Sequence, residues 1–463
     1  MLFNSYEFLF IFLPLTFLIY FLLNAKGLYF YSKIFIAFAS LVFYSWWNIV
    51  YLPLLLLSIM FNFTIGIMVS NKTENYYLKK FLLAIGIILN ILLLGYFKYM
   101  DFFIENYNLI TNTNLSLLKI TLPLAISFFT FQQISYLVDS YKGFTKEYKF
   151  IDYTIFVTFF PQLIAGPIVH HKEMMPQFAD DKNKVINSRN ISMGLFIFSM
   201  GLFKKVVIAD SFSSYVTNGF DIQEKLTFIE AWITSLSYTF QLYYDFSGYT
   251  DMAIGLALLF NIKLPINFNS PYKATNIQDF WRRWHMTLSR FLRDYIYIPL
   301  GGNKSKDLTT YTNLLITFLF AGIWHGAGWT FVLWGLFHAI AMIIFRIYSK
   351  LNIKLHFIIA WLITFNFLNV TWIFFRAKNF DDAIKVLKGL IGLNGLGLAS
   401  IMEFKLILLG LFVTLLITVF TKNSIEKIET FKADYKTLLF ASLIFSISII
   451  FLTRVSEFLY FNF

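Results

Sequence analysis

The sequence predicts an all-α polytopic membrane protein, and its composition and apolar patterning support this prediction. Of 463 residues, 58% are hydrophobic and only 14% are charged, against about 25% charged in a typical soluble domain. Apolar runs recur along the chain, and many approach the ~20 residues that an α-helix needs to cross a bilayer. Examples are residues 8–23, 81–97, 310–323 and 438–452. We expect about eleven to thirteen helices that span or re-enter the membrane.

Net charge and cysteine content exclude several classes of function. The net charge of +12 comes from 38 Lys and Arg against 26 Asp and Glu. In a membrane protein such an excess usually reflects basic cytoplasmic loops. No basic soluble domain is predicted, so we expect no nucleic-acid partner. The chain has no cysteine, which excludes disulfides, thiolate metal sites and an acyl-cysteine intermediate.

The pattern along the chain predicts one membrane-embedded domain, residues 1–463, without a soluble domain or linker. Residues 141–310 mix apolar stretches with polar, Pro- and Gly-bearing segments. Polar backbone at membrane depth is tolerated only inside protein or beside water, so we expect this region to line a cavity. The chain ends in an aromatic tail, residues 454–463, that contains the sequence "FLYFNF".

The sharpest candidate for chemistry is His325, in the stretch "FLFAGIWHGAGWTFVLWGLFHA". An ionisable side chain inside an apolar span is a functional candidate by default. Gly322, Gly326 and Gly328 allow close backbone approach and predict a tight, partly broken helix where a substrate reaches the ring. The alternative is a packing histidine bonded to a backbone carbonyl. His338 follows thirteen residues later, about 220° around one helix, and we expect a structural role for it.

A second candidate, His285, lies in "NIQDFWRRWHMTLSRFLRDYIYIPLGGNK". Interpreted as a helix, this stretch places Trp281 and His285 on one face and pairs Asp279 with Arg283. Such a helix suits a wet cavity that binds an anionic ligand, with Trp281, Arg282 and Arg283 contacting the ligand. The alternative is an interfacial amphipathic helix with its arginines at lipid headgroups.

Other polar residues receive structural interpretations. His170 and His171 begin a charged loop after "FFPQLIAGPIV", and we expect them to be exposed. Asp245 and Asp251 lie beside apolar spans, where a buried carboxylate needs a partner. Arg282 and Arg293, which have no i,i+4 partner of opposite charge in the predicted helix, are candidates. No metal-ligand spacing such as HExxH is present, so no metal is predicted.

These residues together predict acyl transfer inside the membrane. A histidine in a dry niche can act as a general base, because its free pKa of about 6.5 leaves the neutral form available near pH 7. It would take a proton from a hydroxyl that attacks an acyl thioester. Arginines, with Trp324 beside His325, could hold the phosphates of a coenzyme A or phosphopantetheine donor. The alternative is a transporter in which His and Arg form a proton or anion path.

Five stretches resemble the membrane-bound O-acyltransferase (MBOAT) family, most closely its bacterial branch that O-acetylates alginate and peptidoglycan. They are "FFPQLIAGPIVHH", "YYDFSGYTDMAIGLALLFNIKLPINFNSPY", "DFWRRWHMTLSRFLRDYIYIPLGGNK", "GIWHGAGWTFVLWGLFHA" and "WIFFRA". Their order follows that branch, and the similarity covers essentially the whole chain. The resemblance implies a ring of helices around a tunnel through the bacterial cytoplasmic membrane, with no bound cofactor.

The resemblance also implies roles for residues and partners. His325 matches the essential histidine of the family, and His285 matches the second member of its catalytic pair. Acetyl-CoA would enter from the cytoplasm, and a separate extracytoplasmic SGNH-type acetyltransferase would serve a peptidoglycan or alginate-like acceptor. A lipid or protein O-acyltransferase of the same family is the alternative.

The tail has a counterpart in a related system. In teichoic acid D-alanylation, a small membrane partner ends in a similar aromatic motif, whose tyrosine is thought to carry the acyl group. By resemblance, Tyr460 is a candidate acetyl carrier. The alternative is an aromatic end that rests at the membrane interface.

Overall fold

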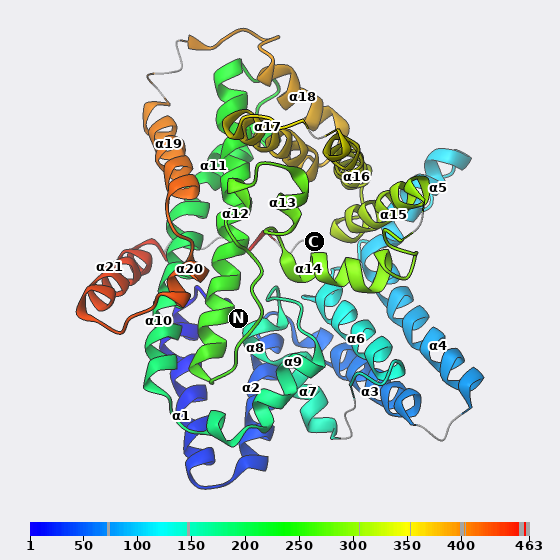
Figure 1. Ribbon diagram of the computed structural model, residues 1–463, viewed down its shortest axis with the longest axis vertical. Helices are drawn as coiled ribbons and strands as arrows, with labels where there is room; N and C mark the ends of the chain where they lie inside the picture. Colours follow the sequence, from blue (N-terminus) through cyan, green and yellow to red (C-terminus); the bar gives the residue numbers. More distant parts are fainter. Residues whose placement is uncertain are drawn as a thin grey trace. The chain divides into compact units, whose positions relative to one another are not determined.

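The structure is a computed structural model that describes residues 1–71, 75–145, 149–304, 306–351, 353–398, 402, 404–452 and 458–459. Within these ranges the chain forms helices and loops and no strand (Figure 1), which confirms the all-α prediction. Two compact units can be distinguished, Met1–Leu202 with Tyr249–Pro265 and Phe431–Phe463, and Phe203–Gly248 with Ile266–Thr430. The predicted single domain and its tunnel depend on how these units associate and stay predictions.

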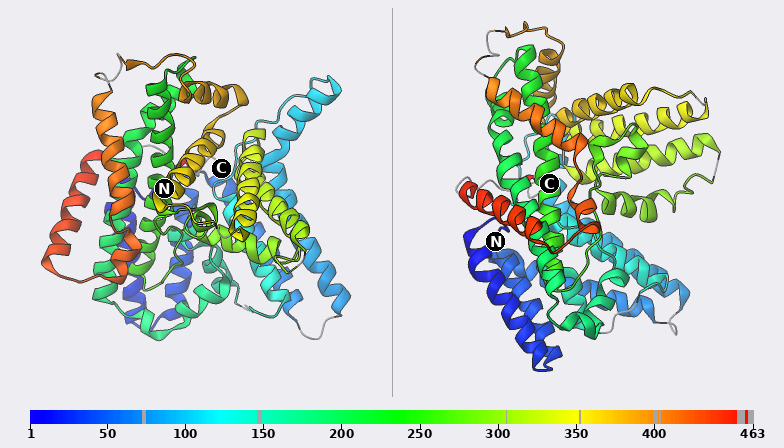
Figure 2. Two further views of the ribbon diagram at one scale, coloured as in Figure 1. Left: turned by 45° about the horizontal axis from the view of Figure 1, so that its top comes forward. Right: turned by 60° about the vertical axis from the view of Figure 1, so that its left-hand side comes forward.

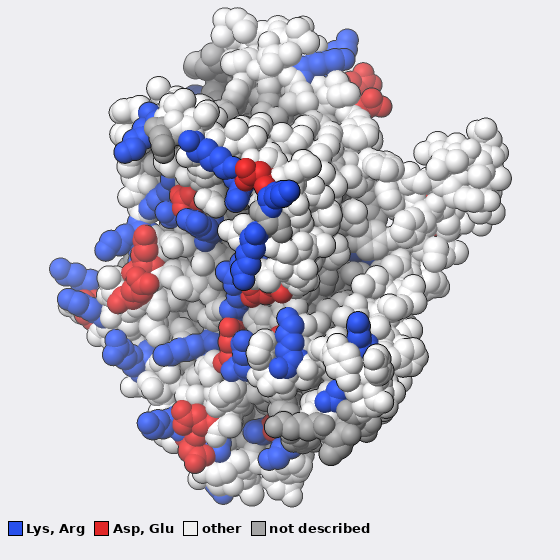
Figure 3. Space-filling view, turned by 45° about the vertical axis from the view of Figure 1, so that its right-hand side comes forward, with Lys and Arg blue, Asp and Glu red and all other residues white. Residues whose placement is uncertain are grey.

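Apolar helices confirm the polytopic prediction. Among the described residues, six helical segments are long and apolar enough to cross a membrane: Phe8–Ala25, Ile49–Ser70, Tyr76–Thr111, Ser188–Ile222, Trp329–Lys350 and Phe357–Arg376. Shorter apolar helices cover Tyr29–Ser45, Lys405–Phe420 and Tyr435–Phe451. On the face drawn in Figure 3, Lys and Arg gather in a band beside broad uncharged areas, as expected where a surface meets both water and lipid.

The first unit contains the N-terminal helices. They are α1 (Leu13–Ala25), α2 (Tyr29–Ser45), α3 (Leu52–Ser70), α4 (Tyr76–Leu94), α5 (Met100–Thr111), α6 (Ile126–Tyr141), α7 (Phe150–Thr158), α8 (Phe160–Leu163), α9 (His171–Ala179), most of α10 (Ser188–Phe203), and α21 (Tyr435–Phe451). Helices α3, α4 and α6 contact one another, and a Cβ at Gly66 would lie 2.3 Å from the ring of Tyr136. Asn62 and Asn90 exchange buried side-chain hydrogen bonds of 3.2 and 2.7 Å between α3 and α4.

The second unit contains both candidate catalytic histidines. Its helices are α11 (Asp210–Thr217), α13 (Ile277–Trp281), α14 (Met286–Leu292), α15 (Asp307–His325), α16 (Trp329–Lys350), α17 (Phe357–Arg376), α18 (Phe380–Leu390), α19 (Lys405–Phe420) and α20 (Ser424–Glu429). Helix α12 (Phe228–Leu259) belongs to this unit as far as Gly248. Helices α15, α16 and α17 lie side by side in sequence order (Figure 2).

Short π- and 3-10-helical segments interrupt or extend the α-helices. The π-helical segments are η1 (Phe8–Phe12), η3 (Gly95–Tyr99), η5 (Lys204–Ala209), η6 (Asn218–Ile222) and η8 (Arg293–Tyr297), and the 3-10 segments are η2 (Ile49–Tyr51), η4 (Asp181–Lys184) and η7 (Pro271–Lys273). Asparagine side chains cap several helix starts, as Asn276 does for α13 and Asn423 for α20. Such caps satisfy backbone N–H groups that have no partner within the helix.

A buried ion cluster stabilises the second unit. The ammonium of Lys205 lies 2.6 Å from Asp245 on α12 and 2.9 Å from Asp210 on α11. Lys205 is only 1% exposed, so its charge depends on these carboxylates. The prediction that Arg282 or Arg293 would pair with Asp245 is wrong: Lys205, forty residues earlier in the chain, reaches the carboxylate from η5, Arg282 is exposed, and Arg293 pairs with Asp294. The structural role expected for Asp245 fits this contact.

Replacement of the central cation tests this cluster. Lys205→Met should lower the free energy of unfolding by about 3–5 kcal/mol, because Asp210 and Asp245 stay buried without the ammonium. Thermal unfolding of detergent-purified protein measures the effect. Lys388→Met, which removes an exposed lysine on α18, is the matched control. An unchanged unfolding midpoint for Lys205→Met would contradict this role.

Candidate active site

His325 lies where the helical backbone is interrupted. Helix α15 ends at His325, and α16 begins at Trp329. Between them Gly326 and Gly328 adopt extended backbone conformations. A Cβ at Gly326 would lie 2.1 Å from the ring of Phe331, so only glycine fits this close turn. The predicted partly broken helix is confirmed.

Two glycines bring the helices on either side of this break into close contact. A Cβ at Gly322 on α15 would lie 2.4 Å from the carbonyl oxygen of Phe331, and one at Gly335 on α16 would lie 2.4 Å from that of Phe318. Backbone atoms cannot move aside as a flexible side chain can. The spacing of α15 and α16 is therefore set by these two residues.

The ring of His325 lies in an aromatic enclosure. His325 is 2% exposed, and its ring centroid lies 5.1 Å from Trp334 and 5.0 Å from Phe375, both in edge-on contacts. The indole of Trp324 lies 4.9 Å away. These neighbours exclude bulk water, which strengthens electrostatic interactions within the site.

His285 occupies a sharp turn and not a helix. Helix α13 ends at Trp281, and His285 has φ 41° and ψ 54°, in the left-handed region that side-chain-bearing residues rarely adopt. The prediction that Trp281 and His285 share a helical face is therefore wrong. The reason is a distant segment: Asn269 N–H donates to the Arg283 carbonyl, and Met286 N–H donates to the Asn267 carbonyl, each at 2.9 Å.

The Asn267 side chain fixes the ring of His285. Nδ1 of His285 lies 3.1 Å from Oδ1 of Asn267, which also accepts from the hydroxyl and backbone N–H of Thr287. Because this oxygen can only accept, Nδ1 donates and Nε2 carries the lone pair. His285 lies outside the helices long enough to span, and burial lowers its pKa to about 3. It is therefore neutral near pH 7.

Trp324 lies beside both candidate catalytic histidines. Its ring centroid is 6.3 Å from that of His285 and 4.9 Å from that of His325. Two histidines that are forty residues apart in sequence thus border one buried indole within the second unit. This arrangement can present an imidazole lone pair in a dry setting.

The predicted ligand-contacting residues lie at the end of α13. Arg283 pairs with Asp279 at 2.9 Å, as expected, and Arg282 is exposed. Trp281 is buried, and its Nε1 donates to Nδ1 of His338 at 3.3 Å. This contact fits the structural role expected for His338.

The structure corrects the expectation for the tandem histidines of the first unit. His170 and His171 are 5% and 6% exposed, so the prediction that both are exposed is wrong. Each meets a polar side chain from elsewhere in the chain: Nδ1 of His170 is 3.4 Å from Asp139, and Nδ1 of His171 is 2.5 Å from Thr145. Across the described ranges, no three His, Asp or Glu residues are grouped so as to hold a metal ion.

The carrier candidate Tyr460 lies outside the described residues. Phe458, two positions earlier, is 1% exposed and makes an edge-on contact with the ring of Tyr249 at 4.5 Å. This part of the aromatic tail is therefore buried within the first unit.

Sequence reasoning missed the residues that hold the two rings. Asn267 fixes His285 from eighteen positions away, and Trp334 and Phe375 flank His325. Asn267 and Trp334 do lie in the stretches "INFNSPY" and "FVLWGLFHA". Their chemical type alone gave no signal of these contacts.

Comparison with known proteins gives consistent matches. The sequence profile of the MBOAT, membrane-bound O-acyltransferase family matches residues 8–380. The peptidoglycan O-acetyltransferase of Helicobacter pylori is 50% identical, over 100% of this chain and 98% of that protein. The probable alginate O-acetylase AlgI of Azotobacter vinelandii is 39% identical, over 83% of this chain and 76% of that protein. The teichoic acid D-alanyltransferase of Bacillus subtilis is 27% identical, over 56% and 69% respectively.

The profile match spans most of the chain and includes both histidines beside Trp324. The matched proteins are acyl-transferring enzymes by name, so the transporter alternative gains no support. Together with the apolar helices, these findings give one conclusion. The chain belongs to the membrane-bound O-acyltransferase family and is a multi-pass enzyme of the bacterial inner membrane.

Proposed function

We propose that this enzyme supplies acetyl groups for the O-acetylation of peptidoglycan outside the cytoplasmic membrane. The placement of His285 and His325 around Trp324 supports a shared catalytic centre. The relative named peptidoglycan O-acetyltransferase matches at 50% identity over the full chain, whereas the alginate relative matches at 39% over 83%. Peptidoglycan is therefore the preferred acceptor over an alginate-like polysaccharide.

In the proposed reaction His325 acts as the general base. Its imidazole takes the proton of an acceptor hydroxyl, and the oxygen attacks the thioester carbonyl carbon of acetyl-CoA to give a tetrahedral oxyanion. Collapse breaks the C–S bond, and the proton on His325 passes to the departing thiolate. The products are an acetyl ester and free coenzyme A. Acetyl-CoA is a substrate of this cycle, and no resident cofactor is required.

His285 acts in the same centre as a neutral hydrogen-bonding group. Its Nδ1 is held by Asn267, so the lone pair of Nε2 is fixed in direction. A fixed group loses little freedom at the moment of reaction, which is how preorganised polar groups favour a transition state. Trp281, Arg282, Arg283 and Trp324 were predicted to contact the donor, and this role stays part of the proposal.

The aromatic tail is proposed to relay the acetyl group. Tyr460 accepts acetyl from acetyl-CoA with His325 as base, and a separate extracytoplasmic SGNH-type acetyltransferase takes the group onto a serine before transfer to glycan. A phenol, with a pKa near 10, is a better leaving group than a sugar hydroxyl. Support comes from Phe458, whose burial against Tyr249 shows that the tail packs within the protein two residues before Tyr460.

Loss of the base should stop the reaction. His325→Ala should reduce acetyl-CoA turnover by purified enzyme, and ester-linked acetate on purified peptidoglycan, by about 10²–10⁴-fold. His356→Asn is the control, because His356 is an exposed N-cap of α17 and Asn keeps the capping function. Normal turnover by folded His325→Ala enzyme would refute the assigned base.

A pH profile should separate the two histidines. Burial lowers the pKa of His285 to about 3, so its ring does not gain a proton as pH falls from 7 to 5. His285→Asn, whose amide can still donate to Asn267, should lower the rate and leave the apparent pKa of the acid limb unchanged. Rates measured between pH 5 and 8 test this. A displaced acid limb in the variant would show that His285 titrates there.

The carrier role depends on one oxygen atom. Tyr460→Phe should reduce peptidoglycan acetate in cells to the level of a strain without the gene, because no phenol remains to accept the group. Tyr435→Phe removes the hydroxyl of an exposed tyrosine at the start of α21 and serves as the control. Full acetylation with Tyr460→Phe would exclude the carrier and leave the role of His325 intact.

A further inference from the structure

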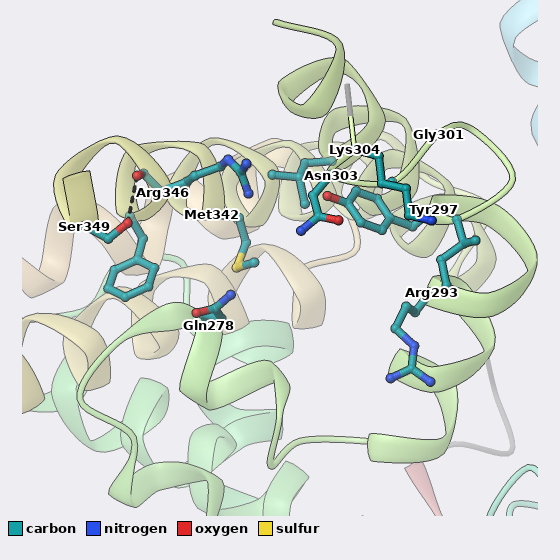
Figure 4. Close-up of a pocket in the computed structure, with 13 residues that line it drawn as sticks. Gln278, Arg293, Tyr297, Gly301, Asn303, Lys304, Met342, Arg346 and Ser349 are labelled. Atoms are coloured by element: carbon teal, nitrogen blue, oxygen red, sulfur yellow. Dashed lines mark hydrogen bonds between the residues drawn. The ribbon is translucent and has the colours of Figure 1, made fainter. Parts of the chain in front are cut away.

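A separate pocket in the second unit has a volume of about 640 Å³, within the range typical of small-molecule sites. Figure 4 shows its lining side chains, which come from α13, η8 and the turn after it, α15 and α16. The described residues that line it include Gln278, Arg293, Asn303, Lys304, Met342 and Arg346. Neither His325 nor the predicted ligand-contacting arginines, Arg282 and Arg283, are among them.

The charges of this pocket favour an anion. Arg293, Lys304 and Arg346 line it, and none of the thirteen described lining residues is a carboxylate. Arg293 already pairs with Asp294 at 2.7 Å, so Lys304 and Arg346 carry the positive charge that a ligand would meet. Nε of Arg346 is buried without a hydrogen-bond partner among the described residues. Its guanidinium approaches Asp307 only to 4.0 Å, because Lys350 engages that carboxylate at 2.5 Å. The guanidinium of Arg346 therefore keeps N–H groups that can donate hydrogen bonds to a ligand.

The wall that faces Arg346 is a tightly bonded turn. Gly301 and Gly302 have positive φ angles of 108° and 59°, and Gly302 N–H donates to the Tyr297 carbonyl at 2.9 Å. The side chain of Asn313 on α15 donates to the Gly302 carbonyl at 3.0 Å. These bonds hold Asn303 and its neighbour Lys304 in place. Figure 4 shows the side chains of Asn303 and Arg346 pointing toward one another, with Met342 and, from α13, Gln278 below them.

One stripe of α16 connects the pocket with the catalytic histidine. Arg346, Met342, His338 and Trp334 follow one another at intervals of four residues, so each side chain neighbours the next in a stripe that winds by about 120° around the helix. Trp334 contacts the ring of His325. On α13, Gln278 of the pocket precedes Trp281, the hydrogen-bond partner of His338, by one turn.

The length of this stripe matches the arm of one donor. Twelve residues separate Trp334 from Arg346, which is about 18 Å at ~1.5 Å per residue. The Arg346 side chain shortens the gap, because helical side chains lean toward the N-terminus. A pantetheine arm is a chain of roughly twelve atoms, equal to about four extended residues or ~14 Å. The axial rise between the residue that contacts His325 and the pocket is thus of the same order as one pantetheine arm.

We propose that this pocket binds the phosphate groups of the acetyl-CoA donor, with Arg346 and Lys304 as their principal contacts. This assignment rests on the proposed function, and it adds a phosphate site between α16 and the Gly301–Gly302 turn to the donor contacts proposed at the end of α13. An anionic phospholipid headgroup presents the same phosphate chemistry and is the other source of such a ligand.

Binding of unacetylated coenzyme A, measured without any transfer reaction, tests the pocket. Full-length enzyme in phosphatidylcholine nanodiscs is titrated with coenzyme A by calorimetry. Arg346→Gln and Lys304→Gln should each weaken binding by about tenfold or more, as expected for loss of a charged hydrogen bond. Inorganic pyrophosphate should compete in the unmodified enzyme. Lys388→Gln, an identical charge change at an exposed site on α18, should leave binding unchanged.

The outcomes are distinct. If both variants have the unfolding midpoint of the unmodified enzyme and still bind coenzyme A with unchanged affinity, the pocket is not the phosphate site, even if acetyl transfer proceeds. If phosphatidylglycerol in the nanodisc weakens coenzyme A binding to the unmodified enzyme and not the residual binding to the two variants, lipid and coenzyme A phosphates share the pocket and the assignment holds. If the binding of phosphatidylglycerol depends on Arg346 and Lys304 and the binding of coenzyme A does not, the pocket is a lipid site and the assignment fails. If coenzyme A binding depends on both residues but the unmodified enzyme transfers no acetyl group, the phosphate site is supported and the proposed function is refuted.

Discussion

The close contact between α15 and α16 determines the position of most of the functional groups in the second unit. Gly322 and Gly335 place each helix against a carbonyl oxygen of the other, and no side chain fits between them. This contact sets His325, at the end of α15, beside Trp334 near the start of α16. It also sets Asp307, at the other end of α15, beside Lys350. The histidine enclosure and the basic pocket are thus two ends of one helix pair.

His285 depends on a different constraint, a backbone turn held by a distant segment. A left-handed conformation at a residue with a side chain costs of order 1 kcal/mol or more. The hydrogen bonds that Asn267 accepts from His285, Met286 and Thr287, and the one that Asn269 donates to Arg283, offset this cost and hold the turn in place. Such strain persists only where the surroundings over-determine it, which is common at functional sites. The turn places the His285 ring 6.3 Å from that of Trp324, between ring centroids.

Local features of the sequence could be predicted, and long-range contacts could not. The break after His325 and the Asp279–Arg283 pair depend on neighbouring residues, so glycine content and helical spacing were sufficient. The turn at His285 and the burial of His170 depend on Asn267 and Asp139, eighteen and thirty-one positions away. Without a known tertiary contact, helical periodicity favoured a continuous helix at His285 and a charged neighbourhood favoured exposure at His170.

Helix α16 has the neutral aromatic residue Trp334 beside His325 at one end and the cationic Arg346 at the other, so its two ends suit different parts of a ligand. A buried ion loses hydration and must be paired, whereas a neutral imidazole is tolerated in a dry site and keeps its lone pair. His285 is neutral beside Trp324, and His338 accepts a hydrogen bond in the interior. The cationic Arg346 lies at the other end, where its side chain is 33% exposed and lines the pocket, so its guanidinium can meet a charged ligand at a lower desolvation cost than a fully buried cation would pay. A thioester donor has the same polarity, since its phosphates are ionic and its reacting carbonyl is neutral, so its two ends match the two ends of the helix.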